Sequence, residues 1–209
     1  MGVMTVLAGL TMPAVKGLAS SNGLDTGARR FADLLQLARS EAISQHTIVR
    51  FALATQWTGQ DDAPLRKASL WSWDPETQQY FQTTSWETLP VGIIVESSIP
   101  GYVANASYAT NDASSIKGDC PLNPAFVQQN GFTSATTGST VTMQFVQFLP
   151  TGGAQIPGGS LRNVIFVMTP GYQNADGSLT HTTQFNGQPT NWAQLNVDTL
   201  TGRVRVYQP

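Results

Sequence analysis

The sequence predicts an α+β fold in which one long N-terminal helix packs against antiparallel β-sheet. In the stretch LLQLARSEAISQHTIVRFALAT, residues 34–55, apolar residues recur every three or four positions up to Ile43. An alternating, β-branched run then begins at Thr47. Further along, short apolar runs bounded by Gly, Pro, Asn or Asp follow one another, as strands do. A helix delivered directly into a strand can place its apolar stripe on the sheet that starts there.

The composition excludes several classes of protein. The chain of 209 residues is long enough for one domain with its own core, or one domain with an appendage. With 11 Lys+Arg and 13 Asp+Glu the net charge is −2, so there is no global attraction to nucleic acid or anionic membrane. The low charged fraction of 11%, with 19 Gly and 12 Pro, is typical of an exported, β-rich protein. The single cysteine, Cys120, excludes an internal disulfide and is interpreted as an unpaired thiol in a loop.

We expect residues 1–45 to form the helix, with an apolar part at 1–15 and an amphipathic part at 16–45. The run MGVMTVLAGLTMPAV is uncharged but shorter than the roughly 20 residues that span a membrane. Its first basic residue, Lys16, follows the apolar run, whereas a secretory signal peptide has its basic residues first. We interpret the run as the distal half of a longer apolar helix that begins upstream of Met1. A buried N-terminal helix of a soluble fold is the alternative.

The amphipathic part carries one apolar stripe at helical spacing. The stripe consists of Leu18, Leu24, Phe31, Leu34, Leu35, Ala38, Ala42 and Ile43. Three glycines, at 17, 23 and 27, each cost about 1 kcal/mol in a helix interior, and Pro13 costs roughly 3 kcal/mol. We therefore expect a bent or frayed helix up to Asn22 or Gly27 and a firm one from there to Ser44 or Gln45.

Residues 46–209 are predicted to be a β-rich domain with a long insertion at about 97–139. The expected strands are Ile48–Ala54, Ala68–Trp73, Gln79–Thr83, Val91–Glu96, Val141–Leu149, Asn163–Met168, Ala193–Asp198 and Arg203–Tyr207. Within the fifth, Val141, Met143 and Phe145 are expected on the buried face. The last two are expected to form a hairpin that turns at Thr199–Gly202.

Several of these segments resemble a known family. An apolar run ending in MPAV, followed by a helix closing on LQLARSEAISQHTIVRF, is similar to type IV pilin-like proteins, in particular minor pseudopilins of the GspH/FimT type. VQFLPTGGAQ and LNVDTLTGRVRVYQP resemble the later strands of that group. The resemblance covers Met4 to about Ala54 and Val141–Pro209. In the middle, YFQTTSWETLPVGIIVE resembles the branch labelled Verru_Chthon cassette protein D.

The resemblance implies a structural role as a minor pseudopilin in a type II secretion or type IV pilus-like fibre. Such proteins are held in the bacterial inner membrane by a single helix, with the globular domain in the periplasm or the fibre, and their partners are other pilins. The residues expected to pack this helix are Val6, Leu7, Ala8, Gly9, Leu10 and Pro13, while Gly17 adds a further small residue. Family precursors also carry a basic leader that is cleaved and then methylated at the new N-terminus, and nothing before Met1 corresponds to it.

Enzymatic chemistry has no support in the sequence. No GxSxG, HExxH or GxxxxGK[ST] motif occurs, so we expect no catalytic residue, cofactor or metal. The two histidines, His46 and His181, are expected to have surface or capping roles. The glycine-rich stretch 151–160 is expected to be a hairpin loop. NADGS, at 174–178, is expected to be an Asp-Gly turn rather than a calcium site.

Two binding functions remain open as alternatives. Arg203 and Arg205 share one face of the last expected strand, at about 7 Å, a spacing that suits phosphates along a DNA strand. The FimT branch resembles this feature with its GRxR tail. Other basic residues are scarce, and Lys16, Arg29 and Arg30 belong to the helix and are expected far from the tail. The two arginines can equally be solvent-facing residues of a hairpin. The second alternative is a secreted adhesin that uses the tryptophan-bearing strands.

Overall fold

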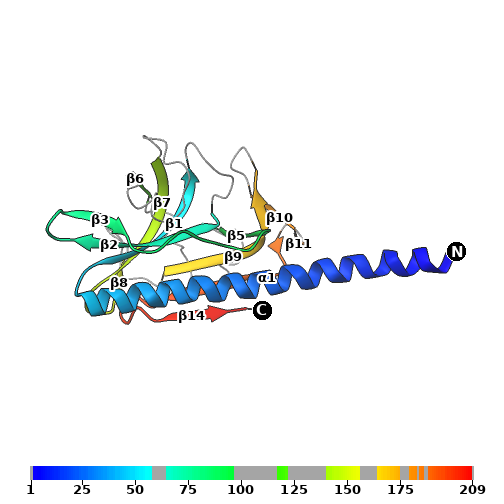
Figure 1. Cartoon of the computed structure of the whole chain (residues 1–209). Helices are drawn as coiled ribbons and strands as arrows, with labels where there is room; N and C mark the ends of the chain where they lie inside the picture. The colour runs from blue at the N-terminus through cyan, green and yellow to red at the C-terminus, as the bar shows by residue number, and fades with distance from the viewer. Residues whose placement is uncertain are drawn as a thin grey trace.

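The computed structural model describes most of the helix and of the β-rich domain. The described residues are 2–57, 65–96, 117–121, 140–155, 164–174, 179–182, 184–185 and 188–208. Side chains of the first helix turns, up to residue 21, are outside the description. The predicted α+β architecture is confirmed: one N-terminal helix packs by its second half on antiparallel sheets (Figure 1).

Helix α1 runs without interruption over Gly2–Gln45, 44 residues. Of the bend or fraying expected up to Asn22 or Gly27, the fraying is wrong, because the helical backbone continues through these residues. Within the described part, the predicted stripe is buried at Leu24, Phe31, Leu34, Leu35, Ala38 and Ala42. Ile43 is the exception, at 37% exposed.

Two glycines in α1 allow the helix to approach the loop between two strands. A Cβ on Gly27 would lie 3.0 Å from Leu89 Cδ2 and 3.3 Å from Pro90 Cδ. A Cβ on Gly23 would meet the nearest atoms of Pro90 and Ile93 at 3.7 Å, an ordinary contact distance. The close packing at Gly27 supplies dispersion contacts that offset the low helix propensity of glycine.

The first sheet has the strand order β3-β2-β1-β7-β6, with β4 added to β2 and β8 added to β7. All of its pairings are antiparallel. Its strands are β1 (Val49–Trp57), β2 (Lys67–Asp74), β3 (Gln79–Gln82), β4 (Glu87–Thr88), β6 (Lys117–Pro121), β7 (Thr140–Phe148) and β8 (Ala154–Gln155). Strand β1 begins four residues after α1 ends, so the predicted passage from helix to strand is confirmed.

The second sheet has the order β10-β9-β13-β14, with β5 added to β9. Its strands are β5 (Ile93–Glu96), β9 (Val164–Gln173), β10 (Leu179–His181), β13 (Ala193–Val197) and β14 (Val204–Tyr207). A further short pair is formed by β11 (Gln184–Phe185) and β12 (Gln188–Pro189). The predicted terminal hairpin is confirmed, because β13 pairs with β14 across the turn at 198–203.

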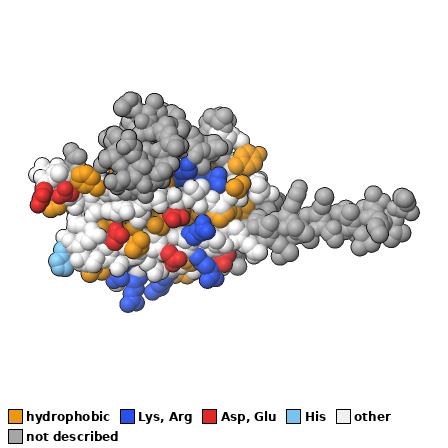
Figure 2. All heavy atoms as spheres, viewed as in Figure 1, with side chains coloured by type: hydrophobic (Ala, Val, Ile, Leu, Met, Phe, Trp, Pro, Cys, Tyr) orange, Lys and Arg blue, Asp and Glu red, His pale blue; other side chains and the backbone are white. Residues whose placement is uncertain are grey.

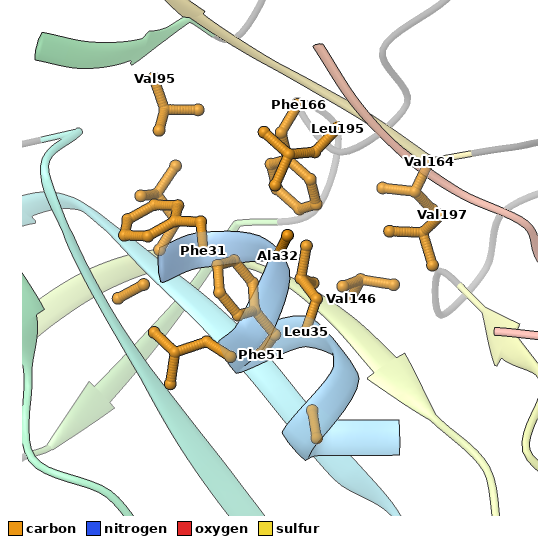
Figure 3. Close-up of a cluster of buried hydrophobic side chains, with 14 of the residues drawn as sticks. Phe31, Ala32, Leu35, Phe51, Val95, Val146, Val164, Phe166, Leu195 and Val197 are labelled. Atoms are coloured by element: carbon orange, nitrogen blue, oxygen red, sulfur yellow. The ribbon is translucent and has the colours of Figure 1, made fainter. Parts of the chain in front are cut away.

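The core lies where α1 meets both sheets (Figure 3). Three phenylalanines join the layers edge to face: Phe31 of α1 and Phe51 of β1 have ring centroids 5.6 Å apart. Phe51 and Phe166 of β9 follow at 5.4 Å. Burial of such side chains contributes about 1.5–3 kcal/mol each, so this stack ties the helix to both sheets.

Two expectations for the middle of the chain need correction. The core face of β7 carries Val146 and Phe148, both fully buried, whereas Phe145 lies on the opposite face against Ala52. Cys120 lies in strand β6, paired with Val141 of β7, rather than in a loop. The expected insertion at 97–139 contains this strand, and its other residues, 97–116 and 122–139, lie outside the described part. Cross-strand pairing decided both points, and local residue preferences do not reveal it.

Candidate functional site

The predicted assembly residues lie on consecutive positions in the first half of α1. Val6, Leu7, Ala8, Gly9, Leu10 and Pro13 all fall within the helix Gly2–Gln45, and their side chains lie outside the description. Successive residues of an α-helix are about 100° apart, so five consecutive positions cover every side of it. The apolar character of this part is therefore not restricted to one stripe. In Figure 1 the helix continues past the sheets towards its N-terminus.

A single arginine attaches the second half of α1 to two turns of the β-domain. Arg39 Nε donates to the carbonyl oxygen of Thr201 at 2.7 Å and to that of Gly152 at 3.2 Å. Thr201 belongs to the turn between β13 and β14, and Gly152 belongs to the turn between β7 and β8. Arg39 therefore links the helix to both sheets. No pattern in the sequence indicated this role for Arg39.

The end of α1 is closed by the histidine at the junction. His46 has a left-handed backbone, with φ of 53°, and its Nδ1 lies 2.7 Å from the carbonyl oxygen of Ile43. That contact places the ring proton on Nδ1, because a carbonyl oxygen only accepts. The hydroxyl of Thr47 donates to the carbonyl of Trp73 in β2 at 2.7 Å. The expected capping role of His46 is confirmed, and the cap turns the chain directly into β1.

The candidate DNA contacts lie at the C-terminal hairpin. Arg205 lies in β14 and pairs with Asn196 of β13, and Arg203 lies just before β14. Both side chains are exposed. In the turn that precedes them, Asp198 Oδ1 accepts from the backbone N–H groups of Leu200 and Thr201. These bonds, Thr201 first, lower the pKa of Asp198, with a smaller contribution from the charge of Arg205.

The tail is closer to the basic residues of the helix than the sequence suggested. Gln208 Nε2 donates to Asp25 Oδ1 at 3.5 Å, and Asp25 forms an ion pair with Arg29 at 2.9 Å. Figure 1 shows β14 running alongside α1, and Figure 2 shows Lys and Arg side chains gathered along the same lower side. The expectation that Arg29 lies far from the tail is therefore wrong. The antiparallel return of β14 along the helix brings the two together.

The second histidine belongs to a buried polar cluster. Glu96, at the end of β5, is only 2% exposed and accepts a hydrogen bond from the hydroxyl of Thr169 in β9. His181 Nε2 of β10 lies 2.6 Å from the same carboxylate oxygen. The surface or capping role expected for His181 is therefore wrong. The cluster holds the short strand β10 against its neighbours, and no periodicity in the sequence indicated it.

Three tryptophans at the first sheet, Trp71, Trp73 and Trp86, pack on aromatic neighbours. Trp71 is 2% exposed and lies edge to face with Trp86, at 6.5 Å. Trp73 packs on Tyr80 at 4.9 Å, and the Arg50 guanidinium lies 3.6 Å from the Tyr80 ring centroid. Burial raises the pKa of Tyr80, and the nearby Arg50 charge opposes this. These rings thus pack within the sheet.

Two further features of the described residues bear on function. No group of three or more His, Cys, Asp or Glu side chains among them could hold a metal ion. Within the same residues, no helix is both long and apolar enough to cross a membrane. The NADGS stretch reaches the described part only at Asn174, so the turn expected there, at 175–178, lies outside it.

Comparison with family models, curated proteins and solved structures gives matches among the solved structures. No protein-family model and no curated protein matches the chain. Two solved structures of EpsH, a minor pseudopilin of the type II secretion system of Vibrio cholerae, each superpose with a TM-score of 0.44. They are 15% and 14% identical to this chain, and each match covers 90% of this chain and 96% of the other.

Proposed function

We propose that this chain is a structural subunit, a minor pseudopilin, that joins or primes a fibre of a type II secretion or type IV pilus-like machine. The observation that supports it is that helix α1 extends beyond the part that packs on its own β-rich domain. Helix α1 has 44 residues, about 66 Å at roughly 1.5 Å per residue. Its described core contacts run only from Leu24 to Ala42. A helix that is apolar on all sides needs another apolar environment, here the helices of neighbouring subunits.

The first half of α1 supplies the chemistry for that packing. Between Gly2 and Val15 the sequence has no charged residue. Helices that associate without a hydrophobic driving force pack closely where their residues are small. Ala8, Gly9 and Gly17 fill this role in the proposal. In the proposal, the N-terminus is processed and methylated, and the helix is held in the inner membrane as a single-pass anchor. The helix is then bundled with other helices in the fibre, outside the membrane.

Cysteine crosslinking in native cells tests the proposal. In a Cys120→Ser background, Gly9→Cys labelled through its thiol with a maleimide–benzophenone reagent is expected to form light-induced adducts with other pilin subunits, because the excited benzophenone inserts into a C–H bond of its neighbour. The control Glu76→Cys, at an exposed turn between β2 and β3, is expected to form far fewer. The mass of the N-terminal peptide from the native membrane provides an independent reading. A soluble protein with an unmodified start, and no adducts from Gly9→Cys, would remove the assembly role.

A second candidate function, DNA binding by a minor pilin, is favoured by one observation. The exposed Arg203 and Arg205 lie on a tail strand that returns along the helix bearing Arg29. Two phosphate contacts give weak binding that decreases steeply with salt. If the function is correct, Arg203→Ala/Arg205→Ala abolishes retention of DNA on filters at low salt, while Arg30→Ala has little effect. Equal retention by the double variant and the wild type eliminates it.

A further inference from the structure

Strand β14 ends the second sheet with an open edge. In the order β10-β9-β13-β14 it is the last strand, and among the described residues it pairs with β13 alone. The Asp198 N–H donates to the Arg203 carbonyl at 2.9 Å, which places these two residues in a hydrogen-bonded pair. Such pairs alternate along an antiparallel ladder. Arg205 and Tyr207 therefore bond to β13, and the backbone groups of Val204 and Val206 point away from it.

This edge is accessible to another chain. Val206 is 40% exposed and Tyr207 39% exposed, and Arg205 is also exposed. The side chain of Val204 packs on the core, so the strand is held in place on its inner face. In Figure 1, β14 lies on the flank of the molecule beside α1, with its other side open. A row of unpaired N–H and C=O groups on a rigid edge is a template for an added strand.

The charges on the strand select the partner. Arg203 and Arg205 stand two positions apart, one just before β14 and one within it. A second copy paired antiparallel about Val204 or Arg205 would bring arginine opposite arginine, which is unfavourable. An acidic strand would instead place carboxylates opposite these guanidinium groups, where a fork of donors binds them well. In these two registers the edge therefore disfavours self-pairing, and its charges favour an acidic sequence.

We propose that β14 binds an extended, acidic segment of a partner protein by β-strand addition. The backbone groups of Val204 and Val206 bond to the added strand, and Arg203 and Arg205 contact its carboxylates. This interaction does not depend on the fibre role, because it uses the far end of the chain from the apolar half of α1. Its failure and the failure of the pseudopilin proposal are thus separate results.

The experiment titrates the full chain with a synthetic peptide of alternating glutamate and valine, and with a matched peptide in which lysine replaces glutamate. The acidic peptide is expected to bind at least about tenfold more tightly, a difference of about 1.4 kcal/mol. Hydrogen exchange provides the structural reading on the wild-type protein. The amides of Val204 and Val206 are expected to gain protection when peptide binds, while that of Arg205, already bonded to β13, changes little.

Two variants complete the test. Val206→Pro removes an outward-facing N–H while leaving the ladder to β13 intact, and is expected to weaken binding about tenfold. Arg203→Glu/Arg205→Glu is expected to reverse the preference between the peptides. Equal binding of both peptides by the wild type, or no new protection at Val204 and Val206, overturns the proposal. A dimer of the chain that Val206→Pro dissociates also overturns it, because the edge then binds a second copy. Peptide binding that responds to the charge reversal but not to Val206→Pro overturns it as well, because such binding is a charge contact of the kind that DNA makes, without strand addition.

Discussion

At the scale of single residues, the turn at the C-terminal hairpin is tightly constrained. Gly202 has a φ of +64°, in the left-handed region that glycine adopts most easily. Its N–H donates to the Asp198 carbonyl at 2.7 Å, and the Asp198 N–H donates to Arg203, so Gly202 and Arg203 together oppose one residue. This is the glycine-led bulge that increases strand twist. The turn thereby directs β14 back along α1.

Replacing Gly202 with alanine is expected to destabilise the fold strongly. A Cβ there would meet the Gly152 carbonyl oxygen well inside contact distance and Arg39 Cδ at 3.0 Å. The left-handed backbone alone costs about 1–2 kcal/mol, and the clash adds to it. Gly92→Ala is the matched control, because Gly92 has a φ of +81° but no atom within 4 Å of the added Cβ. Urea unfolding should show a clearly larger loss for Gly202→Ala, and equal losses would contradict the packing argument.

Asp198 makes the stability of the hairpin depend on acid pH. Its pKa is lowered below the ordinary 3.8, first by the Thr201 N–H. A carboxyl group with a lowered pKa stabilises the folded state above its unfolded pKa, and this contribution is lost as pH falls through the folded value. Asp198→Asn should therefore be less stable than the wild type at neutral pH. The difference in free energy of unfolding between the two proteins should shrink as pH falls below about 3.8 and through the lowered pKa of Asp198. Urea titrations measure this difference, and a constant difference over that pH range would refute the prediction.

At the scale of elements, α1 has an apolar side that packs on the core and a charged side that faces solvent. The stripe from Leu24 to Ala42 faces the core, while Arg29, Arg30 and Asp33 are exposed. Glu41 lies at the border: partial burial raises its pKa, and the Thr83 hydroxyl opposes that shift. The helix thus contacts the β3–β4 connection on one side and the C-terminal hairpin, through Arg39, on the other.

The two glycines of α1 are expected to respond differently to alanine. Alanine gains about 1 kcal/mol over glycine in a helix interior. At Gly23 the added Cβ makes ordinary contacts, so Gly23→Ala should raise the free energy of unfolding by up to about that amount. At Gly27 the Cβ would crowd Leu89 at 3.0 Å, so Gly27→Ala should gain less or be destabilising. Thermal unfolding of both variants measures this, and a larger gain at Gly27 would show that the loop yields freely.

At the scale of the whole molecule, the helix and both sheets form one core. The Phe31, Phe51 and Phe166 rings cross all three layers. Leu65, with a φ of +60°, adds a backbone link, because its N–H donates to Ala54 and its carbonyl accepts from Val95. Under the proposed function, this single body follows any rotation or displacement of α1 in a fibre. The described apolar contacts provide the rigidity that such transmission requires.

Loss of the Arg39 side chain is expected to weaken the attachment of α1 to the two sheets and to lower the free energy of unfolding. Arg39→Ala removes the donor to two carbonyl oxygens from different turns and should cost about 1.5–3 kcal/mol, as hydrogen bonds to charged groups do. Arg30→Ala, on the exposed helix face, should change stability by about 0.5 kcal/mol or less. Chemical denaturation compares them. Hydrogen exchange at Gly202 should also rise in Arg39→Ala alone, and equal stability of the two variants would assign Arg39 a surface role.

Much of the fold could be predicted because its signals are local. The 3.6-residue period from Leu24 to Ala42 and the change of pattern at Thr47 depend on neighbours in the chain. The alternating runs gave β1, β2, β9 and the terminal hairpin within a few residues of their observed limits. The candidate arginines could be placed on the last strand for the same reason. None of these inferences needed to know which strands are adjacent.

What the sequence by itself determined is thus the long helix, its buried stripe, the strand-rich remainder and the position of the turn at Gly202. Only the tertiary structure decided which face of β7 is buried, that Cys120 lies in a strand, and that Gln208 reaches Asp25. It also decided that Arg39 holds two turns and that His181 pairs with Glu96. Periodicity reports only which residues share a face. What packs against that face is set by strand register and by contacts between residues distant in the sequence. Arg39 and Gly152, for example, are 113 positions apart.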